Sequence, residues 1–101
     1  MHVISRAAIK SAMARHPSAA AWLEQWWRHA TKSRWDSLHD VRVLYASADQ
    51  VGRCLVFNAC GNRFRLIVGV KYADEIQGGT LWVKHFLTHA EYDKDDWKGD
   101  C

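Results

Sequence analysis

Long hydrophobic runs are missing from this sequence. A membrane-spanning helix needs roughly 20 consecutive apolar residues, yet residues 66–70 form an apolar stretch that Lys71 ends after only five positions. The first residues, in which Arg6 and Lys10 interrupt a series of alanines, also lack the continuous apolar core of a secretory signal. We therefore expect a cytoplasmic protein with no membrane partner.

Cysteines are few and carry no metal-binding or disulfide pattern. The chain has three, Cys54, Cys60 and Cys101, which is an odd number without a CxxC spacing. Such usage predicts neither a disulfide framework nor a zinc site, so we expect buried or bystander thiols. The acidic residues likewise show no ligand spacing, and we expect no metal and no other cofactor.

Large apolar residues, by contrast, are abundant. With 101 residues, 49% apolar content and six tryptophans, the chain is long enough for one packed domain, residues 1–101, and too short for two.

Charge is distributed unevenly along the chain. Residues 1–90 hold twelve basic and six acidic residues, whereas residues 91–101 hold two basic and five acidic ones. A basic body suits an anionic partner such as RNA, although many ordinary domains share this excess. For the end of the chain, the pattern favours a charged tail, mobile or helical. Its acids are Glu91, Asp93, Asp95, Asp96 and Asp100.

The first half of the chain has helical periodicity. A short strand over residues 1–5 precedes a helix over residues 6–16, with Ser5 as its cap and Pro17 as its stop. Ser18 is placed to cap a second helix, whose apolar positions recur at helical spacing. These positions are Trp22, Leu23, Trp26, Trp27 and Ala30. Residues 33–52 are less regular and predict one helical turn and a connector, followed by a loop over residues 47–52.

From residue 53 onward the period changes to two. Residues 55–60 and 63–72 read as a hairpin around Gly61 and Asn62, and Gly78-Gly79 turns into a third strand over residues 81–88. Helices followed by a meander predict an α+β fold. We expect two N-terminal helices packed on one face of a small antiparallel sheet.

Candidate chemistry lies on the face of the sheet away from the helices. Alternation along residues 63–72 places Arg63, Arg65 and Lys71 on that face. They are also compatible with the solvated side of a half-exposed sheet. The next strand favours a site, because Lys84 and His85 interrupt its apolar run and titratable residues follow its end. These are His89 and Tyr92.

Such residues suit RNA cleavage without a metal. When the ribose 2′-hydroxyl attacks the adjacent phosphate, catalysis needs a base, an acid and cations for the phosphoryl charge. Arg65 fits the last role, since its planar fork can donate two hydrogen bonds to a phosphate. His89 is the better placed histidine for proton transfer, whereas His85 lies in mid-strand and can simply fill space. A structural role for either histidine stays open.

Tryptophans beside basic residues can stack on RNA bases. The helical spacing of Trp22, Trp26 and Trp27 indicates core positions instead, while Trp35 and Trp82 are left undecided.

Several of these segments together resemble the HigB family of toxins, within the wider RelE-like superfamily. The resemblance is carried by Val56-Phe57-Asn58, Gly61-Asn62, Arg65-Leu66, Lys84, Thr88-His89-Ala90-Glu91-Tyr92-Asp93-Lys94 and the opening Met1-His2-Val3-Ile4-Ser5. It spans almost the whole chain, with the loosest match over residues 33–53.

The resemblance implies a metal-independent endoribonuclease that cuts translated messenger RNA on the ribosome. It further implies a cognate HigA-like antitoxin with a helix-turn-helix domain, through which the pair binds operator DNA indirectly. Carried over by position, the catalytic residues are Arg65, Lys84, His89 and Tyr92. The expected RNA contacts are Asn62, Arg63 and Lys71, and Asn58 is cast as structural.

Two alternatives stay open at this point. One is an RNA- or protein-binding module of the same fold without cleavage, since cations that stabilise a transition state also bind a ground state. The other is a repressor subunit that completes an antitoxin complex. Direct DNA reading is not expected, because no segment has a helix-turn-helix pattern.

Overall fold

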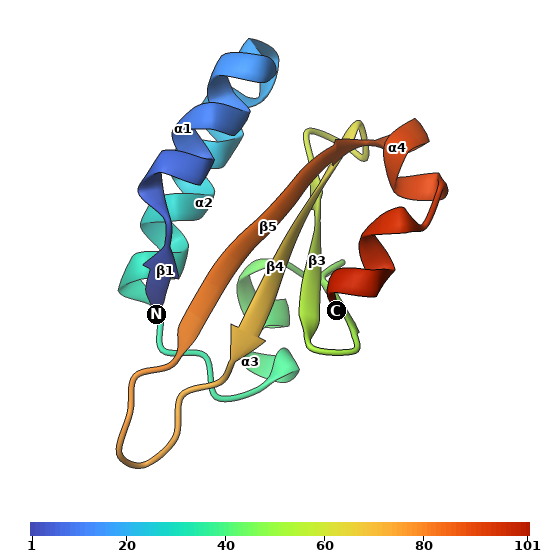
Figure 1. Cartoon of the computed structure of the whole chain (residues 1–101). Helices are drawn as coiled ribbons and strands as arrows, with labels where there is room; N and C mark the ends of the chain where they lie inside the picture. The colour runs from blue at the N-terminus through green and yellow to red at the C-terminus, as the bar shows by residue number, and fades with distance from the viewer.

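A five-stranded sheet forms the centre of the structure, a computed structural model that describes residues 1–101 (Figure 1). The strands are β1 (His2–Ile4), β2 (Asp49–Val51), β3 (Cys54–Ala59), β4 (Phe64–Lys71) and β5 (Thr80–Thr88), in the spatial order β1-β5-β4-β3-β2. The helices are α1 (Arg6–Arg15), α2 (Ala20–Lys32), α3 (Leu38–Leu44) and α4 (His89–Asp93), with 3-10 turns η1 (Pro17–Ala19) and η2 (Asp96–Asp100).

The sheet is mixed, and this corrects the expectation of an antiparallel one. Strands β2 to β5 pair antiparallel, but β1 pairs parallel with β5, with Val3 opposite Leu81. Parallel neighbouring strands need a long crossover connection, and here residues 5–79 form it. Local periodicity carries no information on such a pairing, whereas the α+β class itself is confirmed.

The N-terminal helices follow their predicted signals with one exception. Ser5 caps α1, accepting a hydrogen bond from the Ala8 amide at 3.1 Å. The predicted cap Ser18 is wrong, because Pro17 begins a 3-10 turn that runs directly into α2 without a side-chain cap. Proline suits the start of such a turn, since it has no amide hydrogen to leave unpaired.

Helices α1 and α2 pack side by side against one face of the sheet (Figure 1). Trp26 and Leu23 on α2 are fully buried there, and the Trp26 ring meets the ring of Phe57 edge-on at 5.6 Å. Trp22 and Trp27 are half-buried at the rim of this main core. The apolar face predicted from helical spacing is therefore confirmed.

The segment predicted as a turn and a loop contains two regular elements. Ser37 caps α3, and Trp35 before it is 3% exposed and contacts Phe57. Strand β2 replaces the expected loop, with Gln50 pairing opposite Leu55. An edge strand bonds only one neighbour and can be short and polar, so it lacks the alternation that marks central strands.

The C-terminal tail, residues 89–101, covers part of the other face of the sheet (Figure 1). Trp97 is 2% exposed and forms a second apolar cluster with Val56 and Ile67. The expectation of unpaired cysteines is wrong for two of the three, because Cys54 and Cys101 form a disulfide with their Cα atoms 5.3 Å apart. The bond joins β3 to the tail across 47 residues, a separation that no spacing motif signals.

The longest helix, α2, has 13 residues, and no helix reaches the length and hydrophobicity that a bilayer span requires.

Candidate active site

A capping box fixes the junction between β5 and α4. The Thr88 hydroxyl accepts from the Glu91 amide at 3.2 Å, and the Glu91 carboxylate accepts from the Thr88 amide at 2.9 Å. Hydrogen bonds to the Glu91 carboxylate, first from the Thr88 backbone amide and then from the Thr88 side chain, hold the pKa of Glu91 below its usual value. Within the Thr-His-Ala-Glu-Tyr-Asp segment, Thr88 and Glu91 therefore shape the backbone, which sets His89 and Tyr92 one helical turn apart.

Arg65 on β4 points to the tail face and is only 9% exposed. Its Nη1 donates to the carbonyls of Asn62 at 2.9 Å and Phe64 at 3.1 Å. Its Nε and Nη2 have no hydrogen-bond partner, and neither is fully sealed from solvent. One nitrogen thus anchors the guanidinium, while the other two keep donors for an oxyanion.

Tyr92 contacts both Arg65 and the tail. The guanidinium carbon of Arg65 lies 5.2 Å from the centroid of the Tyr92 ring, and the ring stacks on Trp97 at 5.0 Å with 14° between planes. The Trp97 indole N–H donates to the Tyr92 carbonyl at 2.9 Å. These contacts hold the ring in place, and the phenol hydroxyl makes no hydrogen bond within the chain.

His89, the first residue of α4, lies beside the β3–β4 turn. Its amide donates to the Arg63 carbonyl at 3.2 Å, and its Nδ1 lies 2.9 Å from a carboxylate oxygen of Asp93. This pairing favours a proton on Nδ1, which leaves Nε2 as the nitrogen available to a substrate. The imidazole is 55% exposed, so a bound RNA can reach it.

The cationic residue Arg63 lies in the β3–β4 turn at the edge of this site. It is exposed, and its guanidinium lies over the Phe64 ring, 5.8 Å from the centroid. Asn62 is exposed in the same turn with a φ of 75°, and only its carbonyl is used, by Arg65. Of the seven residues selected from the sequence, the structure therefore brings Arg65, His89 and Tyr92 together. Asn62 and Arg63 adjoin them through their backbone carbonyls, which accept from Arg65 and from the His89 amide.

Lys84 and Lys71 lie elsewhere. Arg65 and Gly69 are four residues apart on β4, about 13 Å at the usual rise per residue, and the Lys84 side chain lies beside Gly69. Its Nζ donates to the Asp100 carbonyl at 2.8 Å. Lys71 lies at the opposite end of β4, where its Nζ donates to Gln77 at 3.1 Å. Neither lysine adjoins Arg65.

A β-bulge in β5 changes which side chains face the tail. Ile67 pairs with His85 and Val68 with Val83, which leaves Lys84 without a partner in the ladder. Consequently Lys84 and His85, although consecutive, both contact Asp100, and His85 Nε2 lies 2.6 Å from its carboxylate. Strict alternation, the only signal in the sequence, places these two residues on opposite faces.

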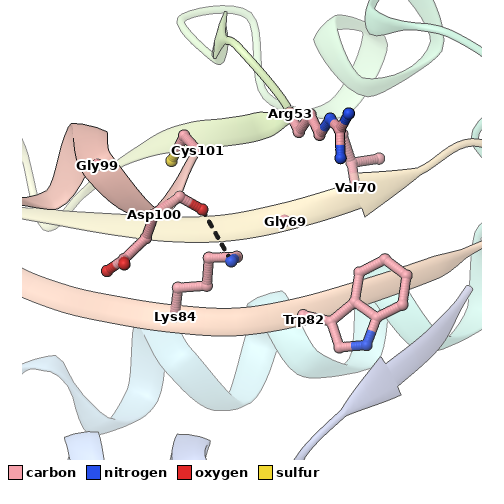
Figure 2. A pocket seen from close by; sticks show the side chains of 8 residues that line it. All are labelled: Arg53, Gly69, Val70, Trp82, Lys84, Gly99, Asp100 and Cys101. Atoms are coloured by element: carbon pink, nitrogen blue, oxygen red, sulfur yellow. Dashed lines mark hydrogen bonds between the residues drawn. The ribbon is translucent and has the colours of Figure 1, made fainter.

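Two hollows flank the tail. A small one of about 250 Å³ lies between β5 and the tail, bordered by His85, Glu91, Lys94 and Trp97 among others. A larger one of about 580 Å³ adjoins Lys84 (Figure 2). Sequence reasoning missed the basic residue Arg53 there, because it precedes a strand and belongs to no motif. No group of three His, Cys, Asp or Glu side chains is arranged to hold a metal ion.

Comparisons with known proteins give a family and a relative. Residues 19–95 match the model of the HigB_toxin family, described as the RelE-like toxic component of a toxin–antitoxin system. The chain is also similar to a protein named mRNA interferase HigB from Escherichia coli O6:H1 (strain CFT073). The two are 26% identical over 97 residues, which cover 93% of this chain and 90% of the relative.

Proposed function

The chain belongs to the HigB family of RelE-like toxins, and from this membership we propose that it is an endoribonuclease that cuts messenger RNA. The relative's name, mRNA interferase, supports this activity. The observation that carries the proposal is the grouping of Arg65, His89 and Tyr92 where β4, β5 and α4 meet, since it supplies phosphate donors and proton-transfer groups within one small region.

The proposed reaction is a transfer within the RNA. The 2′-oxygen forms a bond to phosphorus, the bond to the 5′-oxygen breaks, and the products are a 2′,3′-cyclic phosphate and a 5′-hydroxyl. His89 Nε2 and the Tyr92 hydroxyl are the two protic groups left free, so we assign them the two proton transfers. One accepts the 2′-hydroxyl proton, and the other delivers a proton to the departing 5′-oxygen.

Arg65 is assigned to the phosphate. Its Nε and Nη2 donate to the phosphoryl oxygens, where negative charge grows in the transition state. Because Nη1 is already fixed on two carbonyls, the guanidinium needs little reorganisation to do this. Arg63 and Asn62 contact the RNA next to the cleaved bond. No step of this scheme requires a metal ion, so we propose that cleavage is metal-independent.

Translated messenger RNA on the ribosome is the proposed substrate. A site with one almost fully buried arginine and two proton-transfer groups is sparse. A ribosome can supply the missing orientation of the RNA, which accounts for much of such a barrier. The proposed setting is the cytoplasm. The proposed partner is a cognate HigA-like antitoxin that neutralises the toxin and binds operator DNA for the pair.

The test uses purified chain and one reporter messenger RNA in two states, naked and under translation in a cell extract. We expect cleavage under translation and loss of cleavage in His89→Gln. The matched control is His39→Gln, because His39 is exposed on α3 and its side chain forms no hydrogen bond or ion pair. Intact RNA with the folded wild-type chain would overturn the proposal.

A non-catalytic binding module is the second candidate. The burial of Arg65 favours it, since a guanidinium fixed on Asn62 and Phe64 also suits a purely structural role. Such a module would bind RNA or a partner protein without producing new RNA ends, so the same reporter assay separates the two candidates.

A further inference from the structure

We propose that the hollow beside Trp82 binds one nucleotide of single-stranded RNA, with the base against Trp82 and a phosphate between Arg53 and Lys84. The proposal rests on the proposed function, to which it adds a binding subsite away from the cleaved bond. Figure 2 shows the residues that border this hollow, which has a volume of about 580 Å³.

Gly69 forms the floor of the hollow. It pairs with Cys54 on one side and with Trp82 on the other, so it is the central position of three adjacent strands. A Cβ at this position would lie 2.9 Å from Lys84 Cε and 3.6 Å from Trp82 Cε3. The missing side chain therefore lets the Lys84 stem and the Trp82 ring lie close over the backbone of β4.

Trp82 supplies an aromatic surface. It is 39% exposed, whereas the tryptophans at positions 26, 35 and 97 are buried. An exposed indole beside cations binds nucleobases by stacking, which tolerates any base because every base has a π-face. Trp82 is thus the tryptophan that suits RNA contact, a choice that the sequence left undecided.

Arg53 and Lys84 supply positive charge from two sides. The Arg53 side chain is exposed and has no hydrogen-bond or ion-pair partner in the chain. Lys84 uses one of its three ammonium hydrogens on the Asp100 carbonyl, so two remain for a phosphate. The nearby Asp100 carboxylate lies 2.6 Å from His85 Nε2.

The tail forms a fixed wall of the hollow. Gly99, Asp100 and Cys101 border it, and the Cys101 carbonyl accepts from the Arg53 amide at 2.9 Å. The disulfide to Cys54 holds the same residues against the start of β3. A preformed wall lowers the ordering cost of binding, which favours a ligand as small as one nucleotide.

The subsite and the cleavage site contact different nucleotides. Gly69 lies about 13 Å from Arg65 along β4, which exceeds the roughly 3.4 Å per nucleotide of a stacked strand. Both lie on the tail face of the sheet, and the tail itself, with Trp97 packed on Ile67, stands between them. An RNA strand that contacts both sites therefore has to pass over the tail. The subsite therefore selects or holds an RNA nucleotide near the cleaved bond.

The test is an NMR titration of the full, oxidised chain with adenosine 5′-monophosphate, uridine 5′-monophosphate and ribose 5-phosphate. The indole N–H signal of Trp82 is identified from its loss in Trp82→Phe. We expect both nucleotides to move this signal more than ribose 5-phosphate does. Because both Trp82 variants lack the indole signal, their binding is followed by the backbone amide signal of Gly69, which borders the hollow. Trp82→Ala should weaken nucleotide binding at least about fivefold, and Trp82→Phe should retain most of it.

Charge variants test the phosphate half of the subsite. Arg53→Gln should weaken binding of the nucleotides and of ribose 5-phosphate alike and reduce the salt dependence, while Arg28→Gln on the exposed side of α2 should change neither. An unmoved Trp82 signal, or equal nucleotide binding by Trp82→Ala, would overturn the subsite.

Failure of the subsite and failure of the enzyme are distinguishable. Messenger RNA cleavage by a chain whose Trp82 signal never moves would leave the ribonuclease and remove the subsite. Nucleotide binding at Trp82 by a chain that never cleaves RNA would support the subsite and contradict the ribonuclease.

Discussion

Arg65 on β4 lies against the ring of Tyr92 on α4, with 5.2 Å between the guanidinium carbon and the ring centroid. This contact joins a strand of the central hairpin to the tail helix. It also explains why an arginine expected on an open face is almost fully buried. The same pair therefore contributes to the stability of the tail and, in the proposed reaction, to the phosphate site.

Arg65→Lys tests the geometry of the guanidinium at constant charge. A lysine cannot donate to two carbonyls and still present a planar fork to phosphate. We expect RNA cleavage to fall about 100-fold or more, and the free energy of unfolding to drop by about 0.5–2 kcal/mol from the lost ring contact. Single-turnover cleavage and urea unfolding measure the two effects. Arg28→Lys is the control, and unchanged cleavage in Arg65→Lys would count against the assignment.

Tyr92→Phe separates the hydroxyl from the ring. The variant keeps the contacts with Arg65 and Trp97, so its stability should match that of the wild type within about 0.5 kcal/mol. We expect kcat to fall about 100-fold with KM unchanged, because proton transfer takes place only in the chemical step. A variant with full kcat would reduce Tyr92 to a positioning residue.

The capping box predicts a pH dependence of stability. Hydrogen bonds from Thr88 hold the pKa of Glu91 below its ordinary value of 4.5. A depressed folded-state pKa adds stability above the unfolded value, and this stability is lost as the pH falls through the folded-state pKa. We expect Glu91→Gln to flatten this acid limb in urea unfolding measured from pH 6 down to pH 3. An identical acid limb in the variant would contradict the role of Glu91.

The disulfide predicts a thiol count and a loss of stability. Oxidised protein should have one reactive thiol after unfolding, that of Cys60, and reduced protein should have three. Cys101→Ser should lower the free energy of unfolding by about 2–4 kcal/mol, because the bond closes a long loop in the unfolded chain. Cys60→Ser is the control. Three reactive thiols without reductant would contradict the pairing.

Much of the fold follows from local patterns. The apolar spacing on α2 and the alternation along β3 and β4 predict these elements and the face of the sheet that meets the helices. The other face of β3 and β4 is also buried, because the tail packs on it. The opening strand was predicted over residues 1–5 and is present as β1, but its parallel pairing with β5 was not predicted, because the two strands are separated by most of the chain. Strand β2 was missed, because it is a short polar strand at the edge of the sheet.

The candidate site was predictable in part. Arg65, His89 and Tyr92 lie together because the pairing of β4 with β5 and the capping box of α4 place them at the same end of the sheet. Strand alternation and the Thr-x-x-Glu spacing signal these two features in the sequence. The bulge at Lys84 and the disulfide at Cys101 have no such signal, since each depends on the packing of the tail. Lys84 was consequently grouped with Arg65, although the two lie well apart.

The ends of the cut RNA provide the most direct test of the central proposal. Mapping RNA ends at nucleotide resolution in a translating extract should reveal new cuts within coding sequence. We expect these cuts to be in frame, with a 5′-hydroxyl on one product and a 2′,3′-cyclic phosphate on the other, and to vanish in His89→Gln but not in His39→Gln. No new ends with the folded wild-type chain, or equal ends with His89→Gln, would contradict an endoribonuclease centred on His89.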